Sequence, residues 1–171
     1  MPRARERSAT VSQRAQALAE QFERINARVT AFVERCSEAD WRAPCRDEGR
    51  PVGVVAYHIA AGHRYTVAIV RAGATGQAPP PWVGMTREDG NRINARQAAE
   101  HDDCTREEVL DLLRRNGADV AEFLRGLSDE QLDRRVPFAR DASAEQLARV
   151  ALTGHAEGHL RSLEATIPVA R

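Results

Sequence analysis

The chain has 171 residues, enough for one ordinary domain with a sizeable core. Its 25 basic residues balance its 25 acidic ones, and the arginines are scattered among aspartates and glutamates, so we expect neither nucleic acid nor an anionic membrane as a partner. No apolar run approaches the roughly 20 residues of a membrane-spanning helix, and the N-terminus lacks an apolar signal core, so the expected location is the cytoplasm.

The first predicted element is a long amphipathic helix from about Ser12 to Ser37. Residues 1–11 carry no apolar pattern, and we expect them to form a disordered N-terminal segment. Residues 12–171 are predicted to form a single domain. The apolar residues of the helix recur at steps of three and four, which places them on one face: Leu18, Phe22, Ile25, Val29, Phe32 and Cys36.

A second helix is predicted to begin at Pro51 and to end at Gly73. Proline suits a first helical turn, where its missing N–H would have no partner, and glycine is the common residue just beyond a helix end. His58 shares one face of this helix with Val55 and Tyr65. The Pro- and Gly-rich residues 74–84 follow as a loop, which is long enough to cross over to another part of a bundle.

The second half of the chain is also predicted to be helical. Ser/Thr residues followed three positions later by Asp, Glu or Gln mark the helix starts, as in Thr105 with Glu108 and Ser143 with Gln146. No strand pair is expected. The economical architecture is an all-α four-helix bundle with one additional short helix. The predicted segments are 86–100, 105–126, a short turn at 127–132, and 143–165.

Three of the five histidines can meet if the second and last helices pack together. His155 and His159 are four residues apart, which advances a helix by about 400° and about 6 Å, so both imidazoles project from one face. His58 lies mid-way along the second helix, among apolar residues. At about 8–10 Å between helix axes, His58 would complete a three-nitrogen site, in which metal–nitrogen bonds are about 2.0–2.1 Å long.

The spacing alone also fits a buried, hydrogen-bonded histidine pair or a solvent-facing pair. Gly154 and Gly158 precede the two histidines and favour the close approach of a helix or ligand. Three protein ligands leave positions open for substrate, which is typical of a catalytic metal site rather than a structural one. The segment is not an HEXXH motif, because Glu157 stands two places after His155, and we expect Glu157 to face solvent.

The remaining candidate residues are assigned structural roles. His63 follows His58 by five residues, about 140° around the helix, so we expect it to be structural or exposed. His101 also lies off the shared faces. Cys36 falls on the apolar stripe of the first helix, and Cys45 and Cys104 lie in polar connections. An odd cysteine count without close pairs does not indicate a disulfide framework.

The sequence resembles the DinB-like superfamily of metal-binding four-helix bundles from about Gln13 to Thr166. That superfamily includes the mycothiol- and bacillithiol-dependent S-transferases and the N-terminal domain of mycothiol-dependent maleylpyruvate isomerase. The resemblance implies that His58, His155 and His159 bind one divalent metal ion, and it implies a homodimer. It rests on three segments: the Trp41-x-x-Pro44 turn, residues 51–60 (PVGVVAYHIA) and residues 154–161 (GHAEGHLR).

We therefore interpret the chain as a metal-binding protein that acts on a small-molecule substrate. The expected activity is thiol-dependent S-transfer, in which a divalent ion, zinc or nickel, activates a low-molecular-weight thiol as co-substrate. The alternatives are a metal-dependent hydrolase and a non-catalytic protein that binds a metal or a small ligand. No catalytic residue is assigned. Maleylpyruvate isomerisation is not expected, because the sequence up to Arg171 does not include the C-terminal domain that the isomerases carry.

Overall fold

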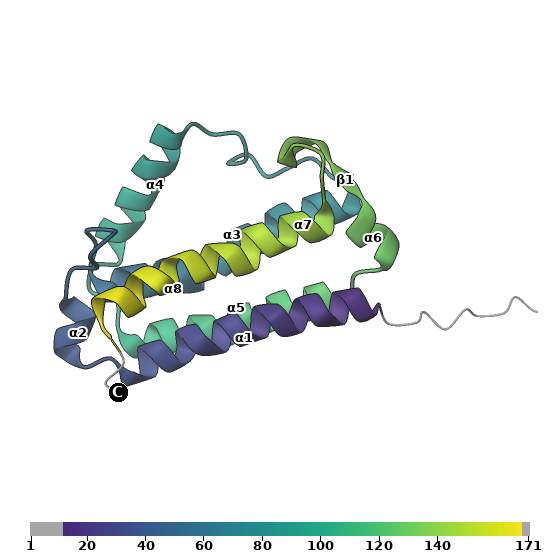
Figure 1. Ribbon diagram of the computed structural model, residues 1–171. Coiled ribbons are helices and arrows are strands. Elements are labelled where there is room, and N and C mark those ends of the chain that lie inside the picture. Colours follow the sequence, from purple (N-terminus) through teal and green to yellow (C-terminus); the bar gives the residue numbers. More distant parts are fainter. Residues whose placement is uncertain (1–11, 169–171) are drawn as a thin grey trace, which may run out of the picture.

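The computed structural model describes residues 12–168, and its long helices lie side by side as a four-helix bundle (Figure 1). The first helix packs against the fifth, and the third packs against both the fifth and the eighth. The predicted all-α bundle is confirmed, whereas the segment predicted to be disordered, residues 1–11, lies outside the described residues. The long helices are α1 (Gln13–Arg35), α3 (Val52–Thr75), α5 (Arg106–Arg125) and a composite last helix of α7 (Ala144–Ala148), the π-helical segment η2 (Arg149–Gly154) and α8 (His155–Thr166).

The shorter elements connect these helices. The loop 76–86 and α4 rise away from the bundle and pass over α3 and α8, and we call residues 76–100 the arch (Figure 1). No residue of α4 is buried, so the arch adds little to the core. The shorter elements are α2 (Glu38–Arg42), α4 (Arg87–Glu100), α6 (Asp129–Asp133), β1 (Arg135–Val136), the 3-10 turn η1 (Pro137–Ala139) and β2 (Ala142–Ser143).

The helix starts follow the predicted capping residues. Ser12 caps α1 by accepting a hydrogen bond from the backbone N–H of Ala15 at 3.1 Å. Thr105 and Glu108 form the predicted capping box of α5, and the corresponding boxes begin α4 and α7. Each box satisfies two backbone N–H groups that have no partner inside the helix.

The end of α3 differs from the prediction. The helix continues past Gly73 and ends at Gly76, which adopts the left-handed conformation with φ 71°. Gly73 is instead a packing position, because a Cβ built there would lie 2.9 Å from Cγ2 of Val136 and 3.1 Å from Cδ2 of Leu147. A glycine that allows close packing and one that ends a helix look alike in sequence.

Two further features were not predicted. β1 and β2 form a two-residue antiparallel pair, too short to show the alternation that identifies a strand in sequence. Arg140 and Asp141, with φ of 57° and 56°, reverse the chain between the two strands. The predicted last helix is also interrupted by η2, although its apolar pattern suggests one continuous helix.

The apolar side chains form one cluster between the long helices. The predicted stripe of the first helix is buried throughout, and Cys36 belongs to it as expected. Cys45 and Cys104 are in connections, but their side chains are buried rather than polar-facing. Within residues 12–168 no helix combines the length and the apolar character needed to cross a bilayer.

A close contact joins α2 to the start of α3. The buried indole of Trp41 lies directly over Gly53, and its Nε1–H donates to the carbonyl of Cys104 at 2.8 Å. A Cβ at Gly53 would lie 2.4 Å from Cε2 of that ring, which is shorter than any ordinary contact. The ring therefore requires glycine at this position.

We predict that Gly53→Ala lowers the free energy of unfolding by roughly 1–3 kcal/mol, because the indole must move out of a packed site. Gly90→Ala is the matched control: Gly90 is also helical, but a Cβ there meets nothing within 4 Å. It should leave the free energy unchanged or raise it by up to about 1 kcal/mol, since alanine is the better helix former. Urea denaturation followed by circular dichroism measures both. Equal effects of the two changes would contradict the prediction.

Candidate metal centre

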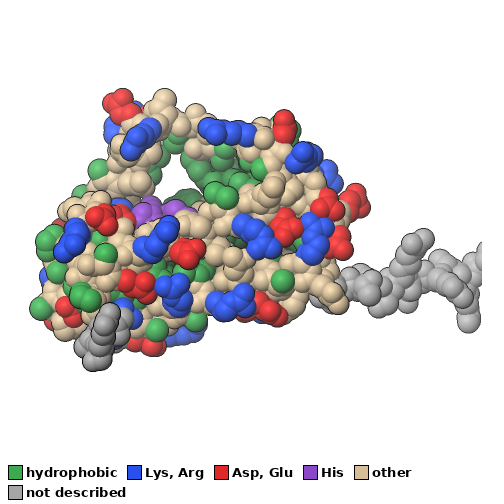
Figure 2. Space-filling view, viewed as in Figure 1, with side chains coloured by type: hydrophobic (Ala, Val, Ile, Leu, Met, Phe, Trp, Pro, Cys, Tyr) green, Lys and Arg blue, Asp and Glu red, His purple; other side chains and the backbone are tan. Residues whose placement is uncertain are grey.

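His58, His155 and His159 converge on one point between α3 and α8. One nitrogen from each ring lies within 4.8 Å of the nitrogens of the other two, and the ring centroids are 4.8–5.2 Å apart. All three side chains are half-buried. Figure 2 shows histidine side chains at the edge of a hollow between the bundle and the arch. The histidines predicted to meet therefore do meet, on a side that a small molecule can reach.

The close approach of α3 and α8 depends on Gly62. A Cβ at this position would lie 3.2 Å from Cε1 of His155, so the bare backbone of α3 provides room for the imidazole. The glycines that the sequence suggested for this purpose do not serve it. A Cβ at Gly158 would meet nothing within 4 Å, and one at Gly154 would meet only the carbonyl of Arg149, at 3.4 Å.

The π-helical segment η2 ends immediately before His155. A π turn holds one residue more than an α turn, so it rotates every later side chain by about 100° relative to an uninterrupted α-helix. His155 and His159 both follow this segment and therefore keep their i, i+4 relation. The insertion changes which way the pair faces, and here the pair faces His58.

Two of the three imidazoles are held by side chains outside the cluster. Nδ1 of His58 lies 3.0 Å from Oε1 of Gln97 in α4, and Nδ1 of His159 is hydrogen-bonded to Oε1 of Glu48. Because both partners are acceptors, each Nδ1 carries the proton and donates it. Nε2 of His58 and Nε2 of His159 are then left with free lone pairs, as metal ligation requires.

Glu48 is presented to α8 by a tight turn. Pro44 and Pro51 form an isolated bridge, and the backbone N–H of Cys45 donates to the carbonyl of Arg50 at 2.7 Å. Gly49 allows the reversal with φ 67°. The second carboxylate oxygen of Glu48 pairs with the guanidinium of Arg50. The turn thus holds the carboxylate between an imidazole and a guanidinium.

The surroundings favour the neutral forms of His58 and His155 and the ionised form of Glu48. Burial and, to a smaller extent, the neighbouring His159 and His58 lower the pKa of His155 to about 3. Burial likewise lowers the pKa of His58. For Glu48, burial alone would raise the pKa, but the hydrogen bonds from His159 and Arg50 outweigh it and bring the value to about 2. Neutral imidazoles are the form in which histidine binds metals.

The nitrogen positions fit a single divalent ion. Nε2 of His155 lies 3.2 Å from Nε2 of His58. Two metal–nitrogen bonds of about 2.0–2.1 Å at a near-tetrahedral angle place their nitrogens about 3.2–3.4 Å apart. The three rings thus form a donor set of the right type and number for a metal with open coordination positions, and the His58–His155 pair also has the right spacing.

The family follows from the sequence, which matches the DinB superfamily over residues 21–163. The chain belongs to the DinB superfamily. No curated protein matches the sequence. YfiT from Bacillus subtilis, described as a probable metal-dependent hydrolase with an unusual four-helix bundle topology, is similar in structure, with a TM-score of 0.64, 19% identity, and coverage of 99% of this chain and 95% of that one.

A second structure of similar fold corrects one expectation. The colibactin self-resistance protein ClbS, solved in complex with a dsDNA, superimposes with a TM-score of 0.70 at 10% identity, covering 92% of this chain and 97% of that one. The expectation that excluded nucleic acid as a partner is therefore wrong as an exclusion, since a protein of this fold binds DNA. A balanced net charge averages over the whole surface and does not describe the charge of any one patch.

Three other polar residues, Glu157, Asp40 and His101, do not belong to the histidine cluster of this DinB-family chain. Glu157 is exposed, as expected. Asp40 forms the capping box of α2 with Ser37. His101 stacks on Tyr57 with ring centroids 4.0 Å apart, and its Nε2 lies 2.9 Å from the tyrosine hydroxyl, which fastens the end of α4 to α3.

Glu48 and Gln97 were missed by the sequence reasoning. Each is far in sequence from the histidine that it holds, and neither belongs to a recognisable motif. The sequence offered one signal, the polar character of the helix predicted at 86–100. The structure shows that this helix, α4, buries no residue, so its inward side chains serve something other than the core.

A groove of about 730 Å³ lies between α3 and α5, on the side of α3 turned away from His58. It contains none of the three histidines. Charged side chains of both signs line it, among them Arg64, Arg71, Asp119 and Glu122. The groove is therefore separate from the candidate metal centre.

His63 is structural and fully buried. Its Nε2 lies 3.0 Å from Oδ1 of Asn26, and its ring packs edge-on against Phe22 at 5.0 Å. Burial lowers the pKa of His63 to about 4, whereas an unfolded chain has a histidine pKa of about 6.5. Below pH 6.5 the unfolded state takes up a proton that the folded state does not, so folded-state stability falls as the pH drops towards 4.

We predict that His63→Gln removes part of this pH dependence, because glutamine can still donate to Asn26 but does not titrate. Between pH 7 and pH 4 the wild type should lose roughly 2–4 kcal/mol more of its free energy of unfolding than the variant. Chemical denaturation of metal-free protein at several pH values gives both curves. If the free energies of unfolding of wild type and variant change in parallel with pH, His63 does not contribute to the pH dependence of stability.

Proposed function

We propose that this protein is a metal-dependent enzyme that transfers a low-molecular-weight thiol to an electrophilic small molecule, with His58, His155 and His159 as its metal ligands. One observation carries the proposal: three imidazoles converge, and the outer nitrogens of two are held by Gln97 and Glu48. An ion at the centre of such a cluster would give the three converging nitrogens a common partner, and the outer hydrogen bonds would orient its ligands.

A divalent ion held there, zinc or nickel, would supply a Lewis acid that favours a thiolate over a thiol at neutral pH. The chain's own residues orient the ligands. Glu48 and Arg50 fix the ring of His159, and Gln97 fixes the ring of His58. Such partners set the tautomer and direction of the ligating nitrogen and increase its basicity.

A thiol suits this centre better than water, because among residues 12–168 we identify no free base beside the histidines. Glu48 is the nearby carboxylate, but its hydrogen bonds to His159 and Arg50 hold its pKa at about 2, although burial alone would raise it. Glu157 is exposed and Asp40 caps a helix. Water as nucleophile needs a group that accepts its proton, whereas a thiol has a much lower pKa and needs less help.

The thiol must come from outside the chain. Cys36, Cys45 and Cys104 are all buried, and burial raises the pKa of Cys36 and of Cys104 to about 11. A buried, protonated thiol is a poor nucleophile. None of the three is therefore proposed as the reacting sulfur.

A second candidate is a metal-dependent hydrolase that uses the same three histidines. The description of YfiT as a probable metal-dependent hydrolase favours it. The two candidates share the ligands and differ in the nucleophile.

The first test combines metal analysis with activity. Protein purified without added metal should contain about one divalent ion per chain, and His58→Ala should contain far less. Loaded wild type should accelerate the reaction of mycothiol or bacillithiol with 1-chloro-2,4-dinitrobenzene over metal-free protein, and His58→Ala should not. Ester or amide hydrolysis without thiol transfer would favour the second candidate. Metal binding without any turnover would indicate a non-catalytic binding protein, and no metal would overturn the proposal.

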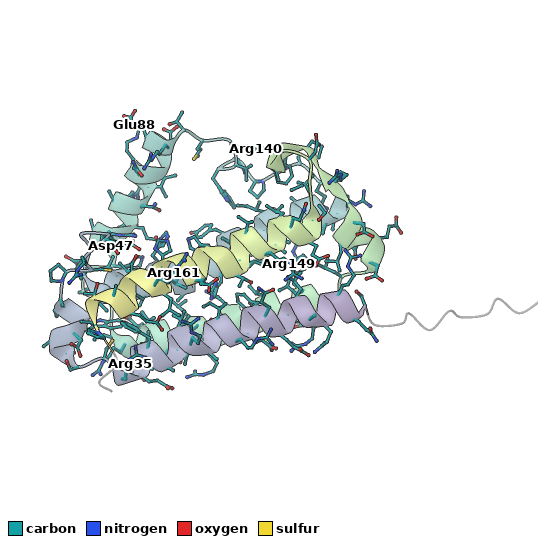
Figure 3. The ribbon with its side chains drawn as sticks, viewed as in Figure 1. Arg35, Asp47, Glu88, Arg140, Arg149 and Arg161 are labelled. Carbon is teal, nitrogen blue, oxygen red and sulfur yellow. The ribbon has the colours of Figure 1, made fainter. Side chains whose placement is uncertain are left out.

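We predict that Glu48→Ala weakens metal affinity by about 10- to 100-fold, because His159 loses the acceptor that orients it. Asp47→Ala is the matched control, since Asp47 is an exposed neighbour in the same turn (Figure 3). Competition with a chromophoric chelator measures the affinity, and circular dichroism checks the fold. Equal affinities for the two variants would exclude a positioning role for Glu48.

A further inference from the structure

The hollow beside the three histidines has an apolar rim. Among residues 12–168, five large apolar side chains are exposed, and four of them belong to α3 or the arch. Figure 2 shows hydrophobic side chains along the hollow and histidines at its edge. Exposed apolar groups gathered around one concavity are typical of a ligand site rather than of an ordinary surface. The four are Tyr65, Trp82, Met85 and Ile93.

Tyr65 lies on the same side of α3 as His58. Seven residues separate them, which is two helical turns, or about 10 Å along the axis and about 20° in rotation. The ring of Tyr65 meets the ring of Trp82 edge-on, with centroids 5.7 Å apart, although the tyrosine remains 53% exposed and the tryptophan 38% exposed. Two aromatic rings in this arrangement leave a face and an edge for a third.

Ile93 is another exposed apolar side chain of the arch. It precedes Gln97 by one turn of α4, and Gln97 holds His58. It is 49% exposed. Ile93 therefore lies about 6 Å along α4 from Gln97, the residue that contacts the histidine cluster.

The side chains in line with His58 on α3, and those nearest Gln97 on α4, are uncharged. The stripe of α3 that begins at His58 continues through Ala61, Tyr65, Ile69 and Ala72. On α4 the half-buried positions nearest Gln97 are Asn94 and Ala98. A charged group placed between such side chains would lose hydration without gaining an ion pair.

We propose that this hollow binds the aromatic group of an uncharged substrate, with Tyr65, Trp82 and Ile93 as its contacts. The inference rests on the proposed function, because it places the polar, reacting end of the same substrate at the three histidines. The spacing of two helical turns indicates a substrate whose ring is separated from its reacting atom by a short chain.

The test compares two metal-binding probes on zinc-loaded protein by calorimetry: butyrohydroxamate and 4-phenylbutyrohydroxamate. Both contain the same chelating group, so the ratio of their dissociation constants measures the contribution of the phenyl ring to binding. The phenyl compound should bind about tenfold more tightly to wild type. Tyr65→Ala should reduce this ratio to about twofold and leave the affinity for butyrohydroxamate unchanged, because Tyr65 does not touch the histidine cluster.

Val150→Ala is the control variant. Val150 is the fifth exposed large apolar residue, at 72% exposure. It directly follows Arg149 in the last helix, and both residues are exposed. This variant should keep the wild-type ratio. Equal binding of the two probes to wild type, or a ratio that survives Tyr65→Ala, would overturn the inference. So would a change in oligomeric state caused by Tyr65→Ala, since the patch would then be a protein interface.

A metal-free measurement separates this inference from the proposed function. Trp82 is one of only two tryptophans, and the other, Trp41, is buried. Neutral 4-phenylbutyramide should shift the fluorescence of wild-type protein but not that of Trp82→Phe. A shift without hydroxamate binding would leave the apolar site standing and contradict the metal centre. Hydroxamate binding with no fluorescence shift and no preference for the phenyl compound would leave the metal centre standing and contradict the apolar site.

Discussion

The contact between α3 and α8 at Gly62 is the constraint on which the rest of the site depends. Without a side chain at Gly62, the imidazole of His155 lies directly against the third helix, with its Cε1 3.2 Å from the place a Cβ would occupy. That separation brings Nε2 of His155 within 3.2 Å of Nε2 of His58. A wider separation would leave two histidines on one helix and one on another, each within reach of solvent and none within reach of a shared ion.

Around this contact the structure is organised in two parts. The four long helices contain the core and hold the histidine rings from within the bundle. The 44–51 turn and the arch lie at the outside of the bundle and hold the outer nitrogens through Glu48 and Gln97. The centre is thus supported from both sides, by packing on one and by hydrogen bonds on the other.

The sequence predicted the parts that depend on local patterns. Apolar periodicity located the long helices, capping residues such as Ser12 and Thr105 located their starts, and the i, i+4 spacing of His155 and His159 with His58 predicted the cluster. Features that depend on tertiary context were not predictable. Gly73 resembled a helix end, the π turn before His155 left no mark in the apolar pattern, and Glu48 is 111 residues from the histidine it holds. Whole-chain charge was also no ground for excluding nucleic acid, since ClbS, a protein of similar fold, has been solved in complex with a dsDNA.

The separation of the buried core, in the bundle, from the exposed arch has a consequence for evolution. Because α4 contributes no buried residue, substitutions along its length and in the preceding loop cost little folding stability. Within residues 12–168, the side-chain hydrogen bonds that join α4 and its C-terminal cap to α3 come from Gln97 and His101. The arch can therefore accept changes in the side chains that face a ligand while the histidine centre and the core beneath it stay intact. A fold arranged in this way can diversify what it binds without having to rebuild the chemistry that it performs.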